Sequence, residues 1–162
     1  MLELLPEGLT KEFVQLAIAL GLLGIVIRLF FAYTIYSTLK LIKKENLCIL
    51  PNQAWFVAMP FFNIYWNFEV VRRLTDSLNN EFFDRQIEVE ENPTQKWGLF
   101  FAWTFLITSI PLPAFILIVI GLLHIGYFIT YWVSIYQHKS LLELHIQHFG
   151  KDYTANKEQD ED

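Results

Sequence analysis

The chain has 162 residues, of which 54% are apolar and 17% aromatic, and its formal net charge is −5. Only 18% of the residues are charged, which is below the usual quarter of soluble domains, and no basic cluster is dense enough to bind nucleic acid. The single cysteine, Cys48, excludes an internal disulfide and any metal site built from several cysteines.

The first apolar segment, residues 13–36, is long enough to cross a bilayer as one helix. Residues 1–7 carry no positive charge, so a cleavable signal peptide is not predicted. Ala17 and Gly21 are four residues apart and form a strip of small residues that would let a second helix approach closely. The same spacing recurs later at Gly98 and Ala102.

Residues 54–71 are predicted as a second crossing, although this segment carries polar residues and Pro60. Because proline lacks an amide donor, Pro60 should kink the helix and free a carbonyl group, which a membrane tolerates only where another group binds it. The alternative is a re-entrant segment, and the two termini would then lie on opposite sides. Residues 70–87 are predicted as an amphipathic extension of this helix at the membrane interface.

The run from Trp97 to Ile135 contains no Asp, Glu, Lys or Arg. As one straight helix it would measure about 58 Å, roughly twice the thickness of the hydrocarbon core. Its only strong turn signal is Pro111-Leu112-Pro113, where two prolines stop a helix. The run is therefore predicted to form two crossings, residues 95–111 and 114–136, joined by a tight hairpin turn.

The sequence thus predicts an all-α membrane protein in which residues 1–150 form a single domain of four transmembrane helices. Cytoplasmic amphipathic extensions are expected, and residues 151–162 are predicted as an acidic flexible tail. With four crossings, eight Lys and Arg residues lie on the side of the termini and three on the other. The positive-inside rule then predicts a multi-pass protein of the inner (plasma) membrane with both termini in the cytoplasm.

Pro60, Asn63, Tyr65 and Trp66 form the most distinctive local motif, Pro-x-x-Asn-x-Tyr-Trp, and an amphipathic helix follows it. Over roughly residues 50–85 the chain resembles an uncharacterised family of small bacterial polytopic inner-membrane proteins, a domain of unknown function that carries this motif in a helical hairpin. The resemblance implies a four-helix inner-membrane protein with no assigned reaction, and it supplies no catalytic residues. From the residues alone, the motif is either a packing joint or part of a ligand site.

Arg28 needs an explanation because it lies near the middle of the first predicted crossing. An arginine at that depth costs about 2.5–3.5 kcal/mol on insertion scales, so it should face protein or water. Helix depths in the predicted bundle bring together Arg28, Asn63, Thr108 and His124. This cluster is either a polar site for an anion, lipid headgroup or substrate, or a structural lock in which Arg28 binds the carbonyl freed by Pro60.

The sequence contains no pattern for nucleophilic, phosphate-binding or paired-carboxylate chemistry, so no catalytic residue is assigned. The predicted function is non-enzymatic: an assembly, scaffold or accessory subunit of a membrane complex, bound to a protein partner or to a second copy of itself. The alternative is a small oligomeric transporter or channel that uses the mid-membrane polar cluster. The predicted partners are the lipid bilayer and this protein or second copy. No cofactor, metal or nucleic acid is predicted.

Overall fold

The computed structural model describes residues 7–151 and 153, with side chains from Lys11 onward, so most of the predicted acidic tail lies outside the described residues. Within that part of the chain every regular element is a helix, which confirms the predicted all-α class. In chain order the elements are α1 (Glu7–Leu41), the 3-10 helices η2 (Lys44–Asn46) and η3 (Pro51–Ala58), α2 (Asn63–Asp84), α3 (Gln95–Thr108) and α4 (Ala114–Phe149).

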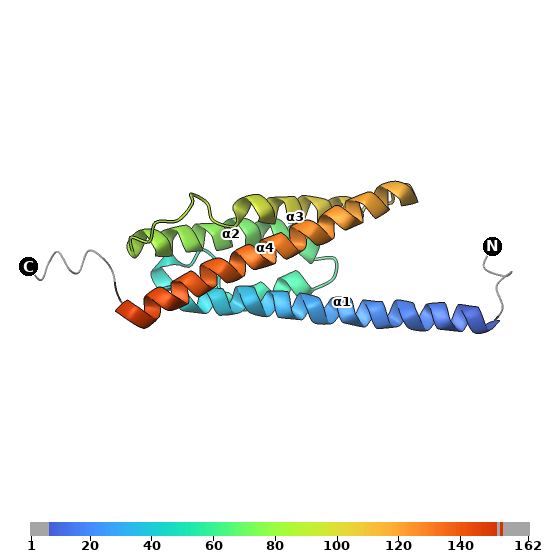
Figure 1. The fold of residues 1–162 in the computed structure, drawn as a ribbon, viewed down its shortest axis with the longest axis horizontal. Coiled ribbons are helices and arrows are strands. Elements are labelled where there is room, and N and C mark those ends of the chain that lie inside the picture. The colour runs from blue at the N-terminus through green and yellow to red at the C-terminus, as the bar shows by residue number, and fades with distance from the viewer. Residues whose placement is uncertain (1–6, 152, 154–162) are drawn as a thin grey trace, which may run out of the picture.

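The two longest helices, α1 and α4, run in the same direction along the long axis of the molecule, and α3 runs in the opposite direction (Figure 1). With 35 and 36 residues, α1 and α4 are each more than about 50 Å long. As a result, the first described turn of α1 and the last turn of α4 lie at opposite ends of the molecule.

The predicted set of four membrane-spanning helices is wrong. Among the described residues only two helices, α1 from Lys11 to Leu41 and α4, are long and apolar enough to cross a membrane. The predicted third crossing, residues 95–111, forms a helix of 14 residues, which is about 21 Å long. It ends at Thr108, just before the Pro111-Leu112-Pro113 turn, as expected where prolines remove backbone donors.

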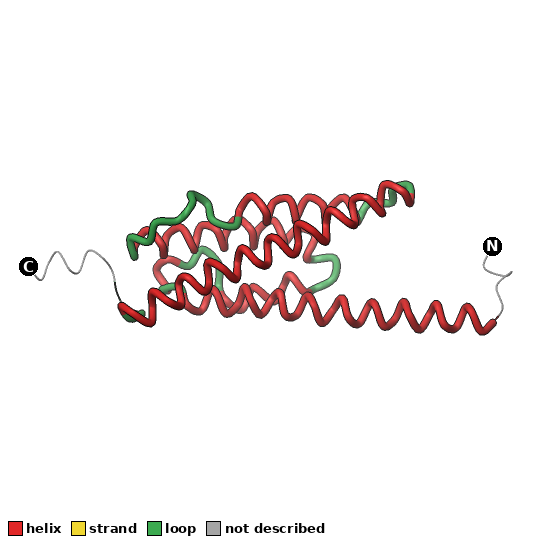
Figure 2. Tube along the Cα trace, viewed as in Figure 1, coloured by secondary structure: helices red, strands yellow, loops and turns green. Residues whose placement is uncertain are grey.

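The predicted second crossing, residues 54–71, is not one helix. The chain forms η3, reverses over residues 59–62 and begins α2 at Asn63, so Pro60 lies in a turn and does not kink a continuous helix. Phe61 has a φ of +64°, and the carbonyl of Pro60 accepts the amide of Phe62 at 2.8 Å. We call residues 51–84 the η3–α2 hairpin; both of its ends lie at the end of the molecule where α1 ends (Figure 2).

Contacts from other helices hold the η3–α2 hairpin in place. The indole nitrogen of Trp66 on α2 donates to the carbonyl of Gln53 on η3 at 3.0 Å, and η3 packs mainly against α1. Val70, Leu74, Leu78 and Phe82 recur at every fourth position of α2, and all are buried in the core. The predicted amphipathic extension therefore exists, but its apolar stripe packs against the protein's own helices.

A buried ion pair fixes the end of the molecule where α1, α2 and α4 finish. Arg85 and Glu81 both have fully buried side chains, and the Arg85 Nε donates to the Glu81 carboxylate at 2.6 Å. Arg85 also donates to the carbonyls of Gly150 and Lys151, at 3.1 and 2.6 Å. The Glu81 carboxylate accepts the amide group of Asn46 at 2.9 Å. This network joins the α1–η3 connection, α2 and the end of α4.

Candidate functional site

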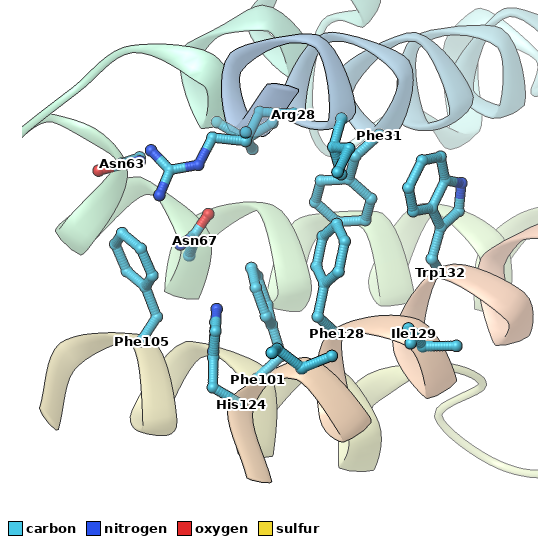
Figure 3. A pocket seen from close by; sticks show the side chains of 14 residues that line it. Arg28, Phe31, Asn63, Asn67, Phe101, Phe105, His124, Phe128, Ile129 and Trp132 are labelled. Carbon is cyan, nitrogen blue, oxygen red and sulfur yellow. The ribbon is translucent and has the colours of Figure 1, made fainter. Parts of the chain in front are cut away.

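A cavity of about 550 Å³ lies between the middle of α1, the start of α2 and the α3–α4 pair (Figure 3). Its walls are mostly aromatic and aliphatic, and they include Phe31 of α1, Phe101 of α3 and Trp132 of α4. Polar groups lie toward one end of the cavity, and Trp132 lies toward the other. We call this space the Arg28 cavity.

Three of the four residues predicted to cluster line the Arg28 cavity: Arg28, Asn63 and His124. Thr108 does not line it, and its hydroxyl donates instead to the carbonyl of Phe105 in the preceding turn, at 2.8 Å. Asn67, which was not predicted, is the fourth polar residue of the lining. The signal was present in the sequence, because residues four apart on a helix, such as Asn63 and Asn67, share one face.

The guanidinium of Arg28 has no hydrogen-bond or ion-pair partner among the described residues. Its central carbon lies over the ring of Phe105, 5.3 Å from the ring centroid. The carboxylate of Glu69 on α2 does not pair with Arg28. It binds Arg73 at 2.7 Å and the hydroxyl of Tyr65 at 3.0 Å. The hydrogen bond from Arg73 holds the pKa of the Glu69 carboxyl below its ordinary value. Because the guanidinium of Arg28 has no hydrogen-bond acceptor among the described residues, the structural lock between Arg28 and the Pro60 carbonyl is not formed.

Asn63 and Asn67 are only 2% and 3% exposed, and in the described part of the chain their side-chain amides have no hydrogen-bond partner. Figure 3 shows the guanidinium of Arg28 projecting between these two amides. Their polar atoms are nevertheless not closed off from the cavity, so they can bind a group that enters it. Two such amides beside an unpaired cation leave the polar end of the cavity short of hydrogen-bond acceptors.

His124 of α4 forms part of the facing wall. Its Nδ1 lies 3.2 Å from the hydroxyl of Thr104 on α3, and its ring stacks on Phe101 with centroids 5.3 Å apart. The ring is thus held by α3 and adds a polar edge to the cavity.

The residues of the Pro-x-x-Asn-x-Tyr-Trp motif have separate roles. Pro60 lies in the turn, and Trp66 joins the two arms of the hairpin through Gln53. Tyr65 is exposed and binds Glu69. Only Asn63 enters the Arg28 cavity. The motif is therefore a packing joint that also positions one polar residue of the cavity.

No family model, curated protein or solved structure matches this chain at a significant level. The resemblance over residues 50–85 therefore stays a prediction, and the geometry of the chain itself carries the functional argument.

Proposed function

We propose that this chain is a multi-pass membrane protein that binds a ligand in the Arg28 cavity. The observation that carries the proposal is that three polar side chains without partners, Arg28, Asn63 and Asn67, converge on one cavity with apolar walls. This function corresponds to the alternative in the sequence analysis, a small oligomeric transporter or channel that uses the mid-membrane polar cluster.

The energetic cost of the cluster supports this proposal. Insertion scales assign about 2.5–3.5 kcal/mol to an arginine at the centre of a membrane helix, and Asn63 and Asn67 add two amides that have no hydrogen-bond partner among the described residues. A cluster with only a structural role would lower this cost by pairing its members, as Glu69 does with Arg73. The hydrogen-bond donors of Arg28, Asn63 and Asn67 are free to bind a group of another molecule.

The direction of the helices supports a revised topology. Because α1 and α4 run in the same direction, the chain between them must return across the bilayer, and we assign this passage to α3 and the uncharged residues 109–113 that follow it. The η3–α2 hairpin then enters and leaves at one face. This arrangement has three passages and places the two termini on opposite sides, in place of the predicted four crossings with both termini in the cytoplasm.

The positive charges agree better with this revised topology. In this topology nine basic residues fall on the face where α1 and α4 end, and among the described residues only Lys11 falls on the other face. The positive-inside rule then assigns the first face to the cytoplasm. The nine basic residues are Lys40, Lys43, Lys44, Arg72, Arg73, Arg85, Lys96, Lys139 and Lys151.

Reporter fusions test this topology. Fusions after Leu47, after Glu91 and after Tyr153 should all report the cytoplasm, and a fusion at the N-terminus should report the opposite side. Four crossings would instead place the fusion after Leu47 outside and the N-terminal fusion in the cytoplasm.

Ligand binding is tested by identifying the small molecules that stay with the protein. We expect mass spectrometry of the protein purified in mild detergent to find a small molecule that Arg28→Leu loses and the exposed-site control Arg72→Leu retains. Identical small molecules in all three proteins, together with lower stability of Arg28→Leu, would show that Arg28 is structural.

A specific observation also favours the leading sequence prediction, an assembly or accessory subunit, as a second candidate function. Residues 11–23 of α1 are all exposed, and a Cβ atom added at Gly21 or Gly24 would meet nothing within 4 Å. A partner helix could approach this strip closely. In a Cys48→Ser background, cysteine at Gly21 should then form a cross-link to the partner, whereas cysteine at the packed Gly98 should not.

A further inference from the structure

We infer that the ligand of the Arg28 cavity is a single-chain amphiphile with a carboxylate head, of the chemical class of a fatty acid. The inference rests on the proposed ligand-binding function and assigns a ligand class to that site. Its head would lie on Arg28, Asn63 and Asn67, and its chain would lie along the aromatic wall that ends at Trp132.

The charge of the lining selects a monoanion. Among the described residues, Arg28 is the only Lys, Arg, Asp or Glu that lines the cavity. A carboxylate neutralises this one charge. A phosphate monoester carries about −1.5 to −2 charges near neutral pH, so it would leave excess negative charge among apolar walls. An uncharged head would leave the guanidinium without a counter-charge, which is costly in a poorly solvated site.

The hydrogen-bond donors also match a carboxylate. An ionised carboxylate offers about four lone-pair positions on two oxygens, and a guanidinium fills two of them with parallel N–H donors. The amide groups of Asn63 and Asn67 lie beside the guanidinium and have free donors for the other two (Figure 3). Contact with the face of Phe105 leaves the N–H edge of Arg28 free to bind the head.

The remaining cavity fits one apolar chain. Beyond the polar end, its walls are formed largely by aromatic side chains from three helices, including Phe31, Phe101 and Phe128. Its volume of about 550 Å³ lies within the range of roughly 300–1,000 Å³ that holds drug-sized ligands. Such a cavity accommodates a single acyl chain but not a whole two-chain phospholipid.

The ligand would enter from the bilayer. Ile125 and Ile129 of α4 line the cavity, yet they are 56% and 54% exposed at the surface of the molecule. The cavity is thus open at the side beside α4, and in the proposed topology that side faces lipid. A molecule dissolved in the membrane reaches the opening without crossing the packed end of the protein.

Binding of radiolabelled palmitate to the full chain in lipid nanodiscs tests this inference, with unlabelled competitors that vary one feature at a time. Unlabelled palmitate should displace the label, whereas hexadecanol and acetate should not, because each lacks either the charged head or the chain. Hexadecyl phosphate should compete at least about tenfold more weakly than palmitate. Equal competition by hexadecanol would overturn the carboxylate assignment, and stronger competition by hexadecyl phosphate would replace it with a phosphate.

Variants connect binding to the cavity. Arg28→Leu and Asn67→Leu should each weaken palmitate binding at least about tenfold, since each removes hydrogen bonds to a charged group. Ile129→Trp, which fills the apolar part of the cavity, should weaken it as well, so the test survives if Arg28→Leu does not fold. Arg72→Leu is the control and should bind normally. Palmitate binding that none of these variants weakens would mean that the ligand lies elsewhere.

The inference and the proposed function can fail separately. If palmitate does not bind but a small molecule still co-purifies in an Arg28-dependent manner, the carboxylate class is wrong and the proposed function stands. If palmitate does not bind and no molecule depends on Arg28, both are wrong.

Discussion

Two regions of this molecule differ in how they accommodate a charged side chain. One is the packed end, where α1, α2 and α4 finish around Arg85, and the other is the cavity region, formed by the residues that line the Arg28 cavity. At the packed end, the side chain of Arg85 is fully buried, and Glu81 and two backbone carbonyls bind its guanidinium. In the cavity region, Arg28 is only partly buried and has no polar partner among the described residues. The packed end satisfies its own charge, whereas the cavity region leaves a charge available for another molecule.

Two glycines show a similar contrast between closely packed and open parts of the helices. A Cβ atom added to Gly98 would lie 2.7 Å from Val71 side-chain carbons and 2.8 Å from the ring of Tyr131, so α2, α3 and α4 approach each other as closely as glycine permits. At Gly21 the same addition would meet nothing. Substitutions should therefore lower the free energy of unfolding strongly where the helices are closely packed. Where the helices are open, they should change it little or raise it.

The largest effect is expected at the buried ion pair. Arg85→Leu leaves the Glu81 carboxylate buried without its counter-charge, so the free energy of unfolding should fall by about 3–5 kcal/mol. Denaturant unfolding in detergent measures this change. The control is Arg73→Leu, which removes a partly exposed pair and should cost at most about 1 kcal/mol. Equal losses in the two variants would show that the packed end does not depend on this pair.

The next effect is expected at the close helix contact. Gly98→Val must displace the side chains of Val71 and Tyr131, which should lower the free energy of unfolding by about 1–3 kcal/mol. Gly21→Val at the open strip should leave the unfolding midpoint unchanged. A comparable loss at Gly21 would mean that α1 has a helix partner in the membrane and would strengthen the assembly hypothesis.

Arg28→Leu should act in the opposite direction. In ligand-free protein this substitution removes an unpaired charge and only one contact with an aromatic ring, so the free energy of unfolding should rise by about 1–2 kcal/mol. Thermal unfolding of delipidated protein in detergent measures this change. A fall in stability would indicate the structural lock that the sequence left open.

The smallest effect is expected at Tyr131. Its hydroxyl is the one buried side-chain polar atom identified without a hydrogen-bond partner among the described residues. Tyr131→Phe removes that group and keeps the ring, so the free energy of unfolding should be unchanged or rise by up to about 1 kcal/mol. A clear fall would mean that a bound water or ligand satisfies this hydroxyl, which would extend the polar part of the cavity region.

Local signals in the sequence predicted local structure well. The prolines at 111 and 113 define the α3–α4 turn because their effect on the backbone does not depend on other helices. The reversal at residues 59–62 entered the sequence analysis only as the re-entrant alternative to a crossing, since it depends on η3 packing along α1 and on the bond between Trp66 and Gln53. An apolar run of sufficient length predicts a span, but it does not indicate that the chain turns back.

The candidate site was predicted in part for the same reason. Arg28 was identifiable because a charge in an apolar helix is conspicuous, and helix depth then suggested Asn63 and His124. Thr108 was assigned to the cluster from helix depth alone, whereas its hydroxyl donates to the carbonyl of Phe105 and the residue does not line the cavity. The Arg85 network could not be predicted, since it joins residues from three separate parts of the chain.

The Arg85 network also has a consequence for biosynthesis. Two of its acceptors, the carbonyls of Gly150 and Lys151, are made only after all the described helices, so the guanidinium cannot be fully satisfied before residue 151 has been made. A nascent chain interrupted before residue 150 would keep a guanidinium with unused donors beside the end of α2. Cellular quality control removes incompletely folded chains, so this one arginine marks whether translation has reached the end of α4.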